Sequence, residues 1–307
     1  MNEITPKVHI GIPVHNGESY IQEALDSVLA QTFRDFEVII SDNASTDRTE
    51  EICRRYTQKD ARISYYRNEK NIGAAPNFNR VLDLATAPYF QWFAHDDILA
   101  PQFLKKCVEI LNNHPEIVLC HSKVKEIDAS GQFIQKYPFL FNGTDDKAFK
   151  RIKYQIKGHQ CYEVFGLMRR EVLLQTAKMG NYAGGDAVLL VRLNLIGKFY
   201  EIPEYLFFSR RHSTQSGTMK KDFQQWAHWF DPKNKRKINF PYWRIFSEYY
   251  KSVKQSHLRG KDRVFTYFYV WKWCGQRWRL LSKDIIKAVL QLLSVLYLKI
   301  LKSRRQF

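Results

Sequence analysis

The chain of 307 residues has few cysteines, and their spacing carries no metal-binding or redox pattern. No Cys-Xaa-Xaa-Cys pair occurs, and no histidine stands at the spacing that zinc sites use. An odd, scattered set of this kind is typical of reduced structural thiols in a cytosolic protein. The five residues are Cys53, Cys107, Cys120, Cys161 and Cys274.

Two further absences narrow the class of protein. Residues 1–7 are polar and lack the apolar core of a signal peptide, so we expect no export by that route. No Gly-Xaa-Gly-Xaa-Xaa-Gly follows a predicted strand, which leaves a dinucleotide-dependent oxidoreductase as an alternative without a supporting motif. The chain does have 45% hydrophobic and 15% aromatic residues, a composition that argues against disorder and allows one large domain or two.

Positive charge is concentrated near the C-terminus. Residues 1–219 hold 27 Lys and Arg against 26 Asp and Glu, whereas the last 88 residues hold 21 against 5. The same last segment holds six of the seven tryptophans. Such a shift predicts a boundary between a main domain at residues 1–218 and a basic, aromatic-rich helical extension at residues 219–307.

Short apolar runs alternate with segments that have an apolar residue at every third or fourth position. The runs indicate buried strands, and the spaced segments indicate amphipathic helices. Alternation of this kind implies an α/β fold with a mainly parallel central sheet and helices on both faces. The predicted strands are 8–14, 36–41, 63–66 and 89–94, and the predicted helices are 21–29, 48–56 and 76–85.

The last of these strands ends abruptly in two adjacent acids, Asp96 and Asp97. Ionised neighbours repel and lose solvation on burial, so such a pair is expected where a metal or another cation offsets the cost. Ligands also bind at the carboxyl ends of strands in α/β proteins. The pair therefore favours a metal-diphosphate site. The alternative is that one acid only caps the helix predicted from about Pro101.

Four motifs, in sequence order, carry a resemblance to a known family. They are Pro13–Asn16, Ser41–Asp47, Asn71–Gly73 and Ala94–Asp97. Together they resemble the nucleotide-sugar domain of the family 2 inverting glycosyltransferases, which has the GT-A fold. The likeness covers residues 8 to about 217 and continues through the segments Ile127–Gly131, Phe165–Arg170, Gly184–Asp186 and Arg210–Ser213.

The resemblance implies a catalytic domain that uses a nucleotide-diphospho-sugar, with UDP expected and GDP and dTDP open. Pro13 and His15 then contact the nucleotide, and Asp42 accepts a hydrogen bond from an N–H of the base. Asn71 and Gly73 reach the ribose or the diphosphate. Two alternatives stay open: Asp42 as a turn residue that bonds the following backbone, and His15 as an ordinary core or surface histidine.

Family members usually carry Asp-Xaa-Asp where this chain has Ala94, His95 and Asp96. The missing first acid puts the affinity for metal, and metal dependence itself, in question. Mg²⁺ or Mn²⁺ at a diphosphate commonly takes one or two carboxylates with phosphate oxygens and water, so Asp96 can still hold the ion. The resemblance implies His212 as a second ligand, and Asp97 is expected to orient the ribose or a water. His95 is expected to point to the opposite face of an extended chain.

An inverting transfer needs a base that takes the proton of the acceptor hydroxyl while its oxygen attacks opposite the departing diphosphate. The resemblance implies Asp186 for this role, after the small residues 183–185, which let the acceptor approach. The chain departs from the family pattern at Gly185, where many relatives carry an acid. The alternative is that Asp186 only caps the helix that it opens.

The acceptor is not specified by any motif. Residues 137–160 are predicted to form a loop, and by resemblance we expect the acceptor to be a growing cell-surface glycan or a lipid-linked saccharide. A non-catalytic module that binds nucleic acid or another anionic surface is the third alternative, because the C-terminal segment is basic and aromatic.

The C-terminal segment suggests contact with a membrane. Residues 284–301 are predicted to form a helix that is mostly apolar but too interrupted to be identified as a span. Before it, residues 271–273 and 276–279 interleave Trp with Lys and Arg, a pattern suited to the headgroup layer of an anionic membrane. We expect this tail to hold a cytoplasmic enzyme peripherally on the inner face of the cytoplasmic membrane. The alternatives are packing on the main domain and nucleic-acid binding, for which no known module is resembled.

Overall fold

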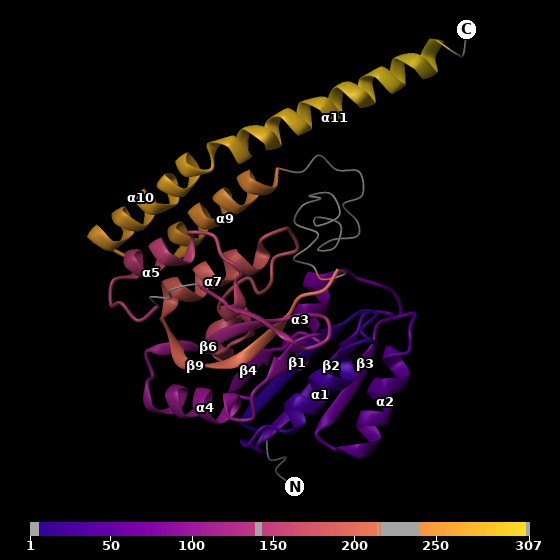
Figure 1. The fold of residues 1–307 in the computed structure, drawn as a ribbon. Coiled ribbons are helices and arrows are strands. Elements are labelled where there is room, and N and C mark those ends of the chain that lie inside the picture. The colour runs from indigo at the N-terminus through magenta and orange to yellow at the C-terminus, as the bar shows by residue number, and fades with distance from the viewer. Residues whose placement is uncertain (1–5, 139–142, 214, 216–239, 305–307) are drawn as a thin grey trace.

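The computed structural model describes residues 6–138, 143–213, 215 and 240–304. Over the first hundred residues it confirms the predicted alternation of strands and helices, with ends that differ by three residues at most (Figure 1). These elements are β1 (Val8–Val14), α1 (Ile21–Leu29), β2 (Phe36–Asp42), α2 (Thr49–Lys59), β3 (Ile63–Arg67), α3 (Ala74–Leu84) and β4 (Tyr89–Trp92).

The middle of the chain contains shorter helices and two long strands. One difference from the sequence prediction is α5, which forms inside the passage 137–160 that was expected to be a loop. The elements are β5 (Ile98–Leu99), α4 (Phe103–Asn113), β6 (Ile117–Ile127), β7 (Phe133–Lys136), α5 (Ala148–Gln155), the 3₁₀ helix η1 (Tyr162–Phe165), β8 (Leu167–Arg169), α6 (Arg170–Leu174), α7 (Gly185–Ile196) and β9 (Lys198–Arg210).

All nine strands found among the described residues belong to one sheet. Its order is β3-β2-β1-β4-β8-β6-β9-β5, with β7 paired to β6. The half formed by β1 to β4 is parallel, as predicted. The other half is mixed, because β8 runs antiparallel to both β4 and β6, whereas β6 and β9 are parallel. This reversal puts the ends of β4 and β9 near the same edge, where the candidate site lies.

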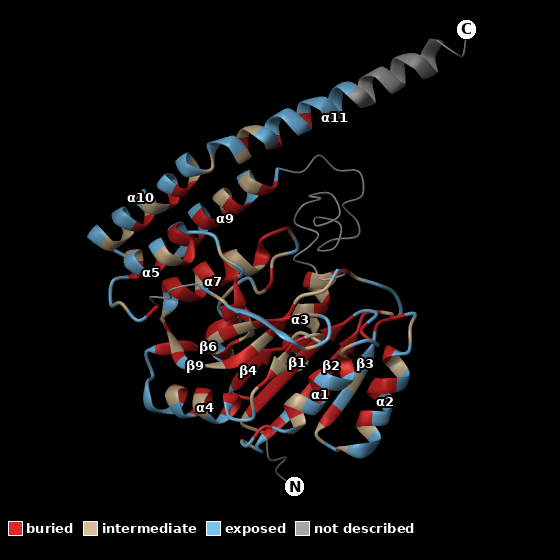
Figure 2. Ribbon diagram, viewed as in Figure 1, coloured by how far each residue is buried: buried red, intermediate tan, exposed pale blue. Residues whose placement is uncertain are grey.

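Helices cover both faces of the sheet, as predicted. One apolar cluster joins β1 and β2 to α1, α2 and α4, and a second joins the opposite face to α3 and α7. The close approach of α3 depends on Gly11 in β1, since a Cβ there would lie only 2.6 Å from Cγ2 of Val81. Figure 2 shows the sheet buried between these helices.

In the described residues 240–304, three further helices follow: α9 (Pro241–Gln255), α10 (Gly260–Gln276) and α11 (Trp278–Arg304). A third apolar cluster packs α9 and α10 against α5 and α7, through residues that include Ile152, Val191, Ile245 and Val270. The predicted boundary at residues 218 and 219 lies outside the described residues. On either side of it, the described elements share this core.

The helix predicted for residues 284–301 is longer than expected, because α11 begins at Trp278. It leads away from the body of the molecule (Figure 1), and its described side chains are mostly exposed (Figure 2). None of the helices in the described part of the chain has the length and apolar character needed to cross a bilayer.

Candidate functional site

The candidate site is built around Asp96, in the turn that follows β4. Its Oδ2 accepts a hydrogen bond from Nε2 of His212 at 2.9 Å. His212 lies two residues beyond the end of β9, so two segments separated by 116 residues in sequence meet here. Burial alone acts to raise the pKa of Asp96, but the hydrogen bond from His212 and the nearby His95 outweigh it and lower the pKa. The structure thus brings together the two residues predicted to hold the metal.

The neighbouring acid, Asp97, has a different environment. Its side chain is buried, and Oδ1 accepts a hydrogen bond from the backbone N–H of Arg210 at 2.9 Å. Burial raises the pKa of Asp97 well above its usual range, and the charge of Asp96 acts in the same direction. Asp97 therefore connects the β4 turn to β9. Neither acid caps α4, whose N-cap is Gln102.

Arg210 contacts several segments around the site. It was not singled out from the sequence. It is a fully buried arginine at the end of β9. Its Nε donates to the backbone oxygen of Asp96 at 2.9 Å, and its guanidinium pairs with Glu23 of α1 at 2.5 Å. The same guanidinium donates to the carbonyls of Asp128 and Ala129. Three separate segments are thereby fixed around the turn that carries Asp96.

Aromatic and imidazole rings surround the Asp96–His212 pair. The ring of Tyr20 lies 4.9 Å from that of His212, between centroids, and also contacts the Arg210 guanidinium. The ring of His95 lies against Gly17, where a Cβ would be only 2.6 Å from its Cδ2. Burial lowers the pKa of His95, and the Asp96 carboxylate offsets this only in part.

The predicted nucleotide-binding residues lie at the ends of β1 and β2, along the same edge. Pro13 is buried opposite Ser41 in the parallel pair, and His15 is exposed just beyond β1. Two hydrogen bonds join the loops: the N–H of Asn16 donates to Oγ of Ser45, and the N–H of Asn43 donates to the carbonyl of Val14. These bonds hold the two strand ends side by side.

Asp42, at the end of β2, is fully buried and well bonded. Its Oδ1 accepts from the N–H of Ser45 at 2.8 Å, so the turn role left open by the sequence is present. Its Oδ2 accepts from the Tyr65 hydroxyl at 2.6 Å and from Nη1 of Arg67 at 2.8 Å. These contacts fix the direction of the carboxylate.

Asn71 and Gly73 lie in the turn that leads into α3. Oδ1 of Asn71 accepts hydrogen bonds from Nδ2 of Asn43 and from the N–H of Gly73. Gly73 is the N-cap of α3 and has a φ of +94°, a conformation that side-chain-bearing residues rarely adopt. The glycine is therefore needed for the turn itself, whatever it binds.

Asp186, the predicted base, is half-buried in the first turn of α7. The N-cap of this helix is Gly184, with a φ of +85° and no side-chain cap, so Asp186 is not the capping residue. Ile245 of α9 packs against Gly184, since a Cβ there would lie 2.7 Å from its Cδ1. The C-terminal helices thus support the end of α7 that carries Asp186.

The chemistry of Asp96 and His212 fits a divalent cation. In an octahedral site with bonds of about 2.1 Å, two adjacent ligand atoms stand roughly 3 Å apart, close to the 2.9 Å between these two atoms. No group of three or more His, Cys, Asp and Glu side chains suited to a metal occurs among the residues described by the structure. Two protein ligands are nevertheless enough where phosphate oxygens and water complete the shell.

A polar cluster next to His212 was not predicted from the sequence. Arg211 pairs with Glu126 of β6 and contacts the hydroxyl of Tyr162. That hydroxyl also donates to Oε1 of Glu126 at 2.9 Å. Burial acts to raise the pKa of Glu126, but the Arg211 guanidinium outweighs it and lowers the pKa. Only the resemblance at Arg210–Ser213 pointed to this region.

Comparison of the sequence with known proteins places it among glycosyltransferases. The chain is 30% identical over 171 residues to an uncharacterized glycosyltransferase of Methanocaldococcus jannaschii, covering 55% of this chain and 57% of that protein. It is 38% identical over 122 residues to one of Rickettsia typhi, covering 39% and 37%. The matches therefore span only about half, or less, of the length of these relatives.

Solved structures share the fold at low sequence identity. S. aureus TarS 1–349, in complex with UDP-GlcNAc, has a TM-score of 0.66 at 16% identity, over 93% of this chain and 81% of that one. The mannosyltransferase PcManGT from Pyrobaculum calidifontis, in complex with GDP-Man and Mn²⁺, has a TM-score of 0.59 at 15% identity, over 98% and 83%. The expected GT-A fold is thereby confirmed.

The family assignment rests on more than half of the chain. A family model described as glycosyl transferase family 2 matches residues 9–176, a range that includes all four motifs and the β-α-β half of the sheet. With the motifs in order, the fold shared with glycosyltransferase structures and the glycosyltransferase relatives, the chain belongs to glycosyl transferase family 2.

Proposed function

We propose that the protein is an inverting glycosyltransferase that moves a sugar from a nucleotide-diphospho-sugar to a hydroxyl of a saccharide or lipid-linked acceptor. The observation that carries this is the pairing of Asp96 with His212, at the edge where Pro13, His15 and Asp42 also lie. A carboxylate and an imidazole placed beside nucleotide-binding strand ends are suited to a metal-bound diphosphate.

In the donor site, Asp42 binds the nucleobase of the nucleotide-sugar. Its carboxylate is oriented by Tyr65 and Arg67. Because the carboxylate is fully buried, the partly exposed Arg67 side chain would have to move aside for a nucleobase N–H to bond to it. Pro13 and His15 border the nucleotide at the end of β1, while Asn71 and Gly73 border the ribose or diphosphate. We take UDP as the nucleotide. The related folds are known with UDP, UDP-GlcNAc and GDP-Man, so GDP is the first competitor.

Asp96 and His212 would hold Mn²⁺ or Mg²⁺, which when bound neutralises charge on the departing diphosphate. Asp97 has a supporting role in this proposal, because its side chain is buried against Arg210. The contact with ribose or water predicted for it from the sequence is therefore not used.

Asp186 is the general base. Its carboxylate takes the proton of the acceptor hydroxyl as the oxygen attacks the anomeric carbon from the side opposite the diphosphate. The carbon–oxygen bond to the diphosphate breaks, and the configuration of the sugar inverts. The space that Gly184 and Gly185 were expected to leave is filled by Ile245 and by the backbone of Gly180, so the acceptor approaches this carboxylate from another side.

The donor assignment is tested by calorimetry of the full chain with UDP-GlcNAc, GDP-mannose and dTDP-glucose, each with and without Mn²⁺. We expect heat of binding for the UDP-sugar, stronger with the metal. Absence of binding for all three would exclude a nucleotide-sugar enzyme. Binding of NAD instead would favour the oxidoreductase alternative.

The base is tested with Asp186→Asn. Because a positioned base contributes about 10²- to 10⁴-fold, we expect turnover to fall by that order while the donor affinity stays unchanged. The matched control is Asp35→Asn, which removes an exposed carboxylate just before β2, at the opposite end of that strand from Asp42. Near-normal turnover of Asp186→Asn would rule out the assignment.

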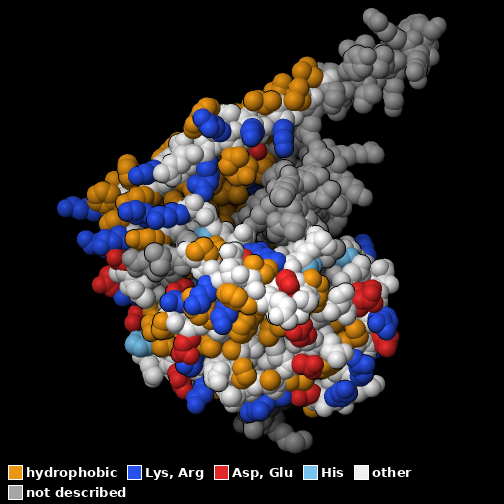
Figure 3. Space-filling model, in the orientation of Figure 1, with side chains coloured by type: hydrophobic (Ala, Val, Ile, Leu, Met, Phe, Trp, Pro, Cys, Tyr) orange, Lys and Arg blue, Asp and Glu red, His pale blue; other side chains and the backbone are white. Residues whose placement is uncertain are grey.

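We further propose that the C-terminal helices attach the enzyme peripherally to an anionic membrane, on the cytoplasmic face, where cell-surface glycans are assembled. Large apolar side chains of α10 and α11 are more than half exposed: Val264, Phe268, Trp271, Trp278, Ile286 and Leu290. Lys and Arg side chains lie among them (Figure 3). Trp273 and Val270 are instead buried, so the packing alternative holds for one face of α10.

A further inference from the structure

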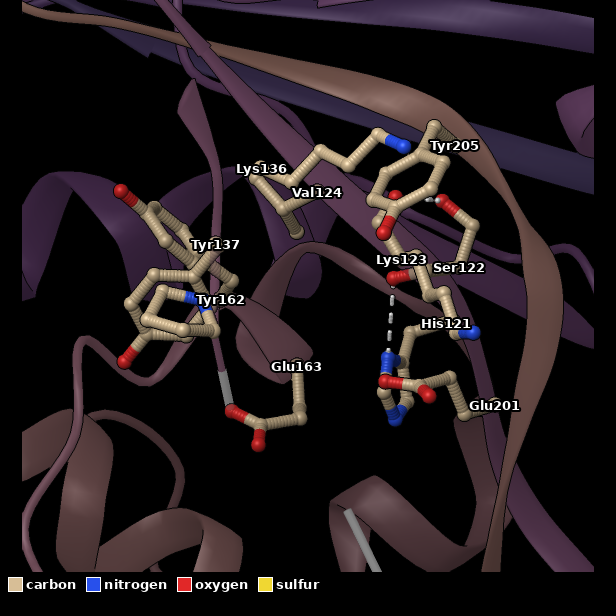
Figure 4. Close-up of a pocket in the computed structure, with 11 residues that line it drawn as sticks. His121, Ser122, Lys123, Val124, Lys136, Tyr137, Tyr162, Glu163, Glu201 and Tyr205 are labelled. Carbon is tan, nitrogen blue, oxygen red and sulfur yellow. Dashed lines mark hydrogen bonds between the residues drawn. The ribbon is translucent and has the colours of Figure 1, made fainter. Parts of the chain in front are cut away.

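A cavity of about 250 Å³ lies outside the Asp96–His212 site, between β6, β9, η1 and the segment that follows β7 (Figure 4). It is open to solvent and lined by polar and aromatic side chains. Those that matter to its chemistry are His121, Tyr137, Tyr162, Glu163, Glu201 and Tyr205. No step of the proposed transfer uses this space.

Three tyrosine rings shape two walls of the cavity. Tyr137 and Tyr162 pack edge to face on one side, with centroids 4.9 Å apart, and Tyr205 of β9 stands on the other. A tyrosine presents a negative ring face and a hydroxyl, so it can pack against the C–H face of a sugar and bond to its hydroxyls. Glu163 and Glu201 add carboxylates that can accept hydrogen bonds from sugar hydroxyls.

Three lysine ammonium groups converge on the Tyr205 ring. The Nζ atoms of Lys123, Lys125 and Lys136 lie 5.9, 5.7 and 5.2 Å from its centroid. Figure 4 shows the Lys136 side chain extended beside this ring. Like charges gathered at one ring repel each other, and a nearby anion would offset this repulsion. Within the described residues, no carboxylate forms an ion pair with any of the three.

The acidic groups of the cavity do not cancel this positive charge. Burial raises the pKa of Glu201 to about 7, with Lys123 opposing the rise, so near neutral pH this side chain carries only part of a charge. Glu163 is already paired with His159 at 2.9 Å. The lysine cluster therefore stays positive beside a cavity that has room for a small ring.

The cavity is close to the proposed reaction centre. Tyr162 lines it, and the hydroxyl of the same residue contacts Arg211, the neighbour of His212. Tyr162 and Arg211 thus connect the cavity wall to the segment that carries His212. A chain of sugar units that reaches the donor from this side would cross the cavity.

We propose that this cavity, with Lys123, Lys125 and Lys136, binds an anionic sugar unit of the acceptor, one that carries a phosphate or a carboxylate. The inference rests on the proposed function, because it treats the bound saccharide as the acceptor. The rings hold the carbon skeleton, and the ammonium groups hold the anion. The acceptor is then an acidic glycan.

The test is calorimetric titration of the full chain with glucose 6-phosphate, glucuronate, glucose and inorganic phosphate. Glucose 6-phosphate or glucuronate should bind at least about tenfold more tightly than glucose or phosphate alone, and which of the two binds better identifies the anion. Lys123→Ala with Lys136→Ala should weaken the acidic sugar by about tenfold or more. Lys59→Ala is the matched control, since it removes an exposed ammonium beside a single ring, that of Tyr56.

Three outcomes would overturn the proposal. Equal affinity for glucose would show a neutral sugar site, and equal affinity for phosphate would show an anion site with no sugar specificity. Binding that is unchanged in the lysine variants would place the ligand elsewhere, such as in the donor site. UDP-GlcNAc binding, measured on the same variants, should be unaffected. If UDP-GlcNAc fails to bind the native chain while the acidic sugar binds normally, the proposed function fails and the cavity assignment stands.

Discussion

At the scale of single residues, Asp96 and His95 differ in what they can offer a metal. Asp96 shares a hydrogen bond with His212, whereas the His95 ring packs against Gly17. Asp96→Ala should therefore abolish the Mn²⁺-dependent part of donor binding, and His95→Ala should change it much less. Manganese titration followed by electron paramagnetic resonance measures both. Equal losses would mean that His95 has taken over the role of the acid missing at Ala94.

Glu201 makes stability depend on pH. Its pKa is about 7 in the folded chain against 4.5 for the free group, so between these values the unfolded chain ionises while the folded chain keeps its proton. Folded-state stability then falls as the pH rises from about 4.5 to 7. Glu201→Gln removes this loss. The variant and the native chain should have similar unfolding free energies at pH 4.5. At pH 8 the unfolding free energy of the variant should be higher by roughly 1–3 kcal/mol, and its melting temperature should be higher as well.

Glu109→Gln on α4 is the control for this prediction, because it removes one exposed carboxylate. The two variants should differ from each other at pH 8. If Glu201→Gln melts like the native chain at both pH values, Glu201 is ionised in the folded state and the cavity is more acidic than inferred.

At the scale of elements, α7 is the helix that joins the two halves of the molecule. Leu190 faces the sheet cluster, while Val191 faces α9 and α10, so the helix is apolar all round. Leu190→Ala and Ile245→Ala, in the sheet cluster and on α9, should each lower stability by about 2–5 kcal/mol. Calorimetry should show one unfolding transition that both variants shift.

The control for the shared core is Val264→Ala, at a side chain of α10 that is 67% exposed, which should leave the transition in place. Two separate transitions, each moved by only one core variant, would instead support an independent C-terminal unit. Because Ile245 rests on Gly184, beside Asp186, Ile245→Ala should also reduce turnover.

The strands and helices of the first hundred residues were predictable because their signals are local. The spacing of apolar residues within each segment predicts whether that segment is a helix or a strand. The alternation of strands and helices then favours parallel pairing. The antiparallel insertion of β8 was not predictable, since it depends on which strand ends meet across the sheet. The short helix α5 was missed because Ala148, Ile152 and Gln155 gain burial only when α7 and α10 cover them.

The site shows the same division. Asp96 was evident as an acid at a strand end, but its pairing with His212 came from family resemblance, because no local pattern links residues 116 positions apart. Arg210 is one of two adjacent arginines in the sequence, and nothing in the local sequence predicts that its side chain is buried. The lysines around Tyr205 come from β6 and β7, and only the finished sheet brings them together.

At the scale of the whole molecule, charge and apolar surface coincide on the C-terminal helices. Full-length protein should co-float with anionic liposomes at low salt and detach as salt rises, since each basic residue contributes about 1 kcal/mol near such a surface. Phe268→Ser with Trp271→Ser should reduce flotation. Phe133→Ser, at an equally exposed ring on β7, is the control. If the native protein does not bind the anionic liposomes at low salt, the proposed membrane attachment is wrong.

The bond between Asp97 and Arg210, 113 residues apart, has a consequence for synthesis on the ribosome. Strands β1 to β4 can pair with one another once about the first hundred residues have emerged, although β4 still lacks its second partner, β8. Asp96 at that stage has neither His212 beside it nor Arg210 to fix its turn. A nascent chain thus acquires the strands proposed to bind the nucleotide early, and the complete proposed reaction centre only after β9 leaves the exit tunnel. An unfinished chain would then lack the groups needed to consume the donor.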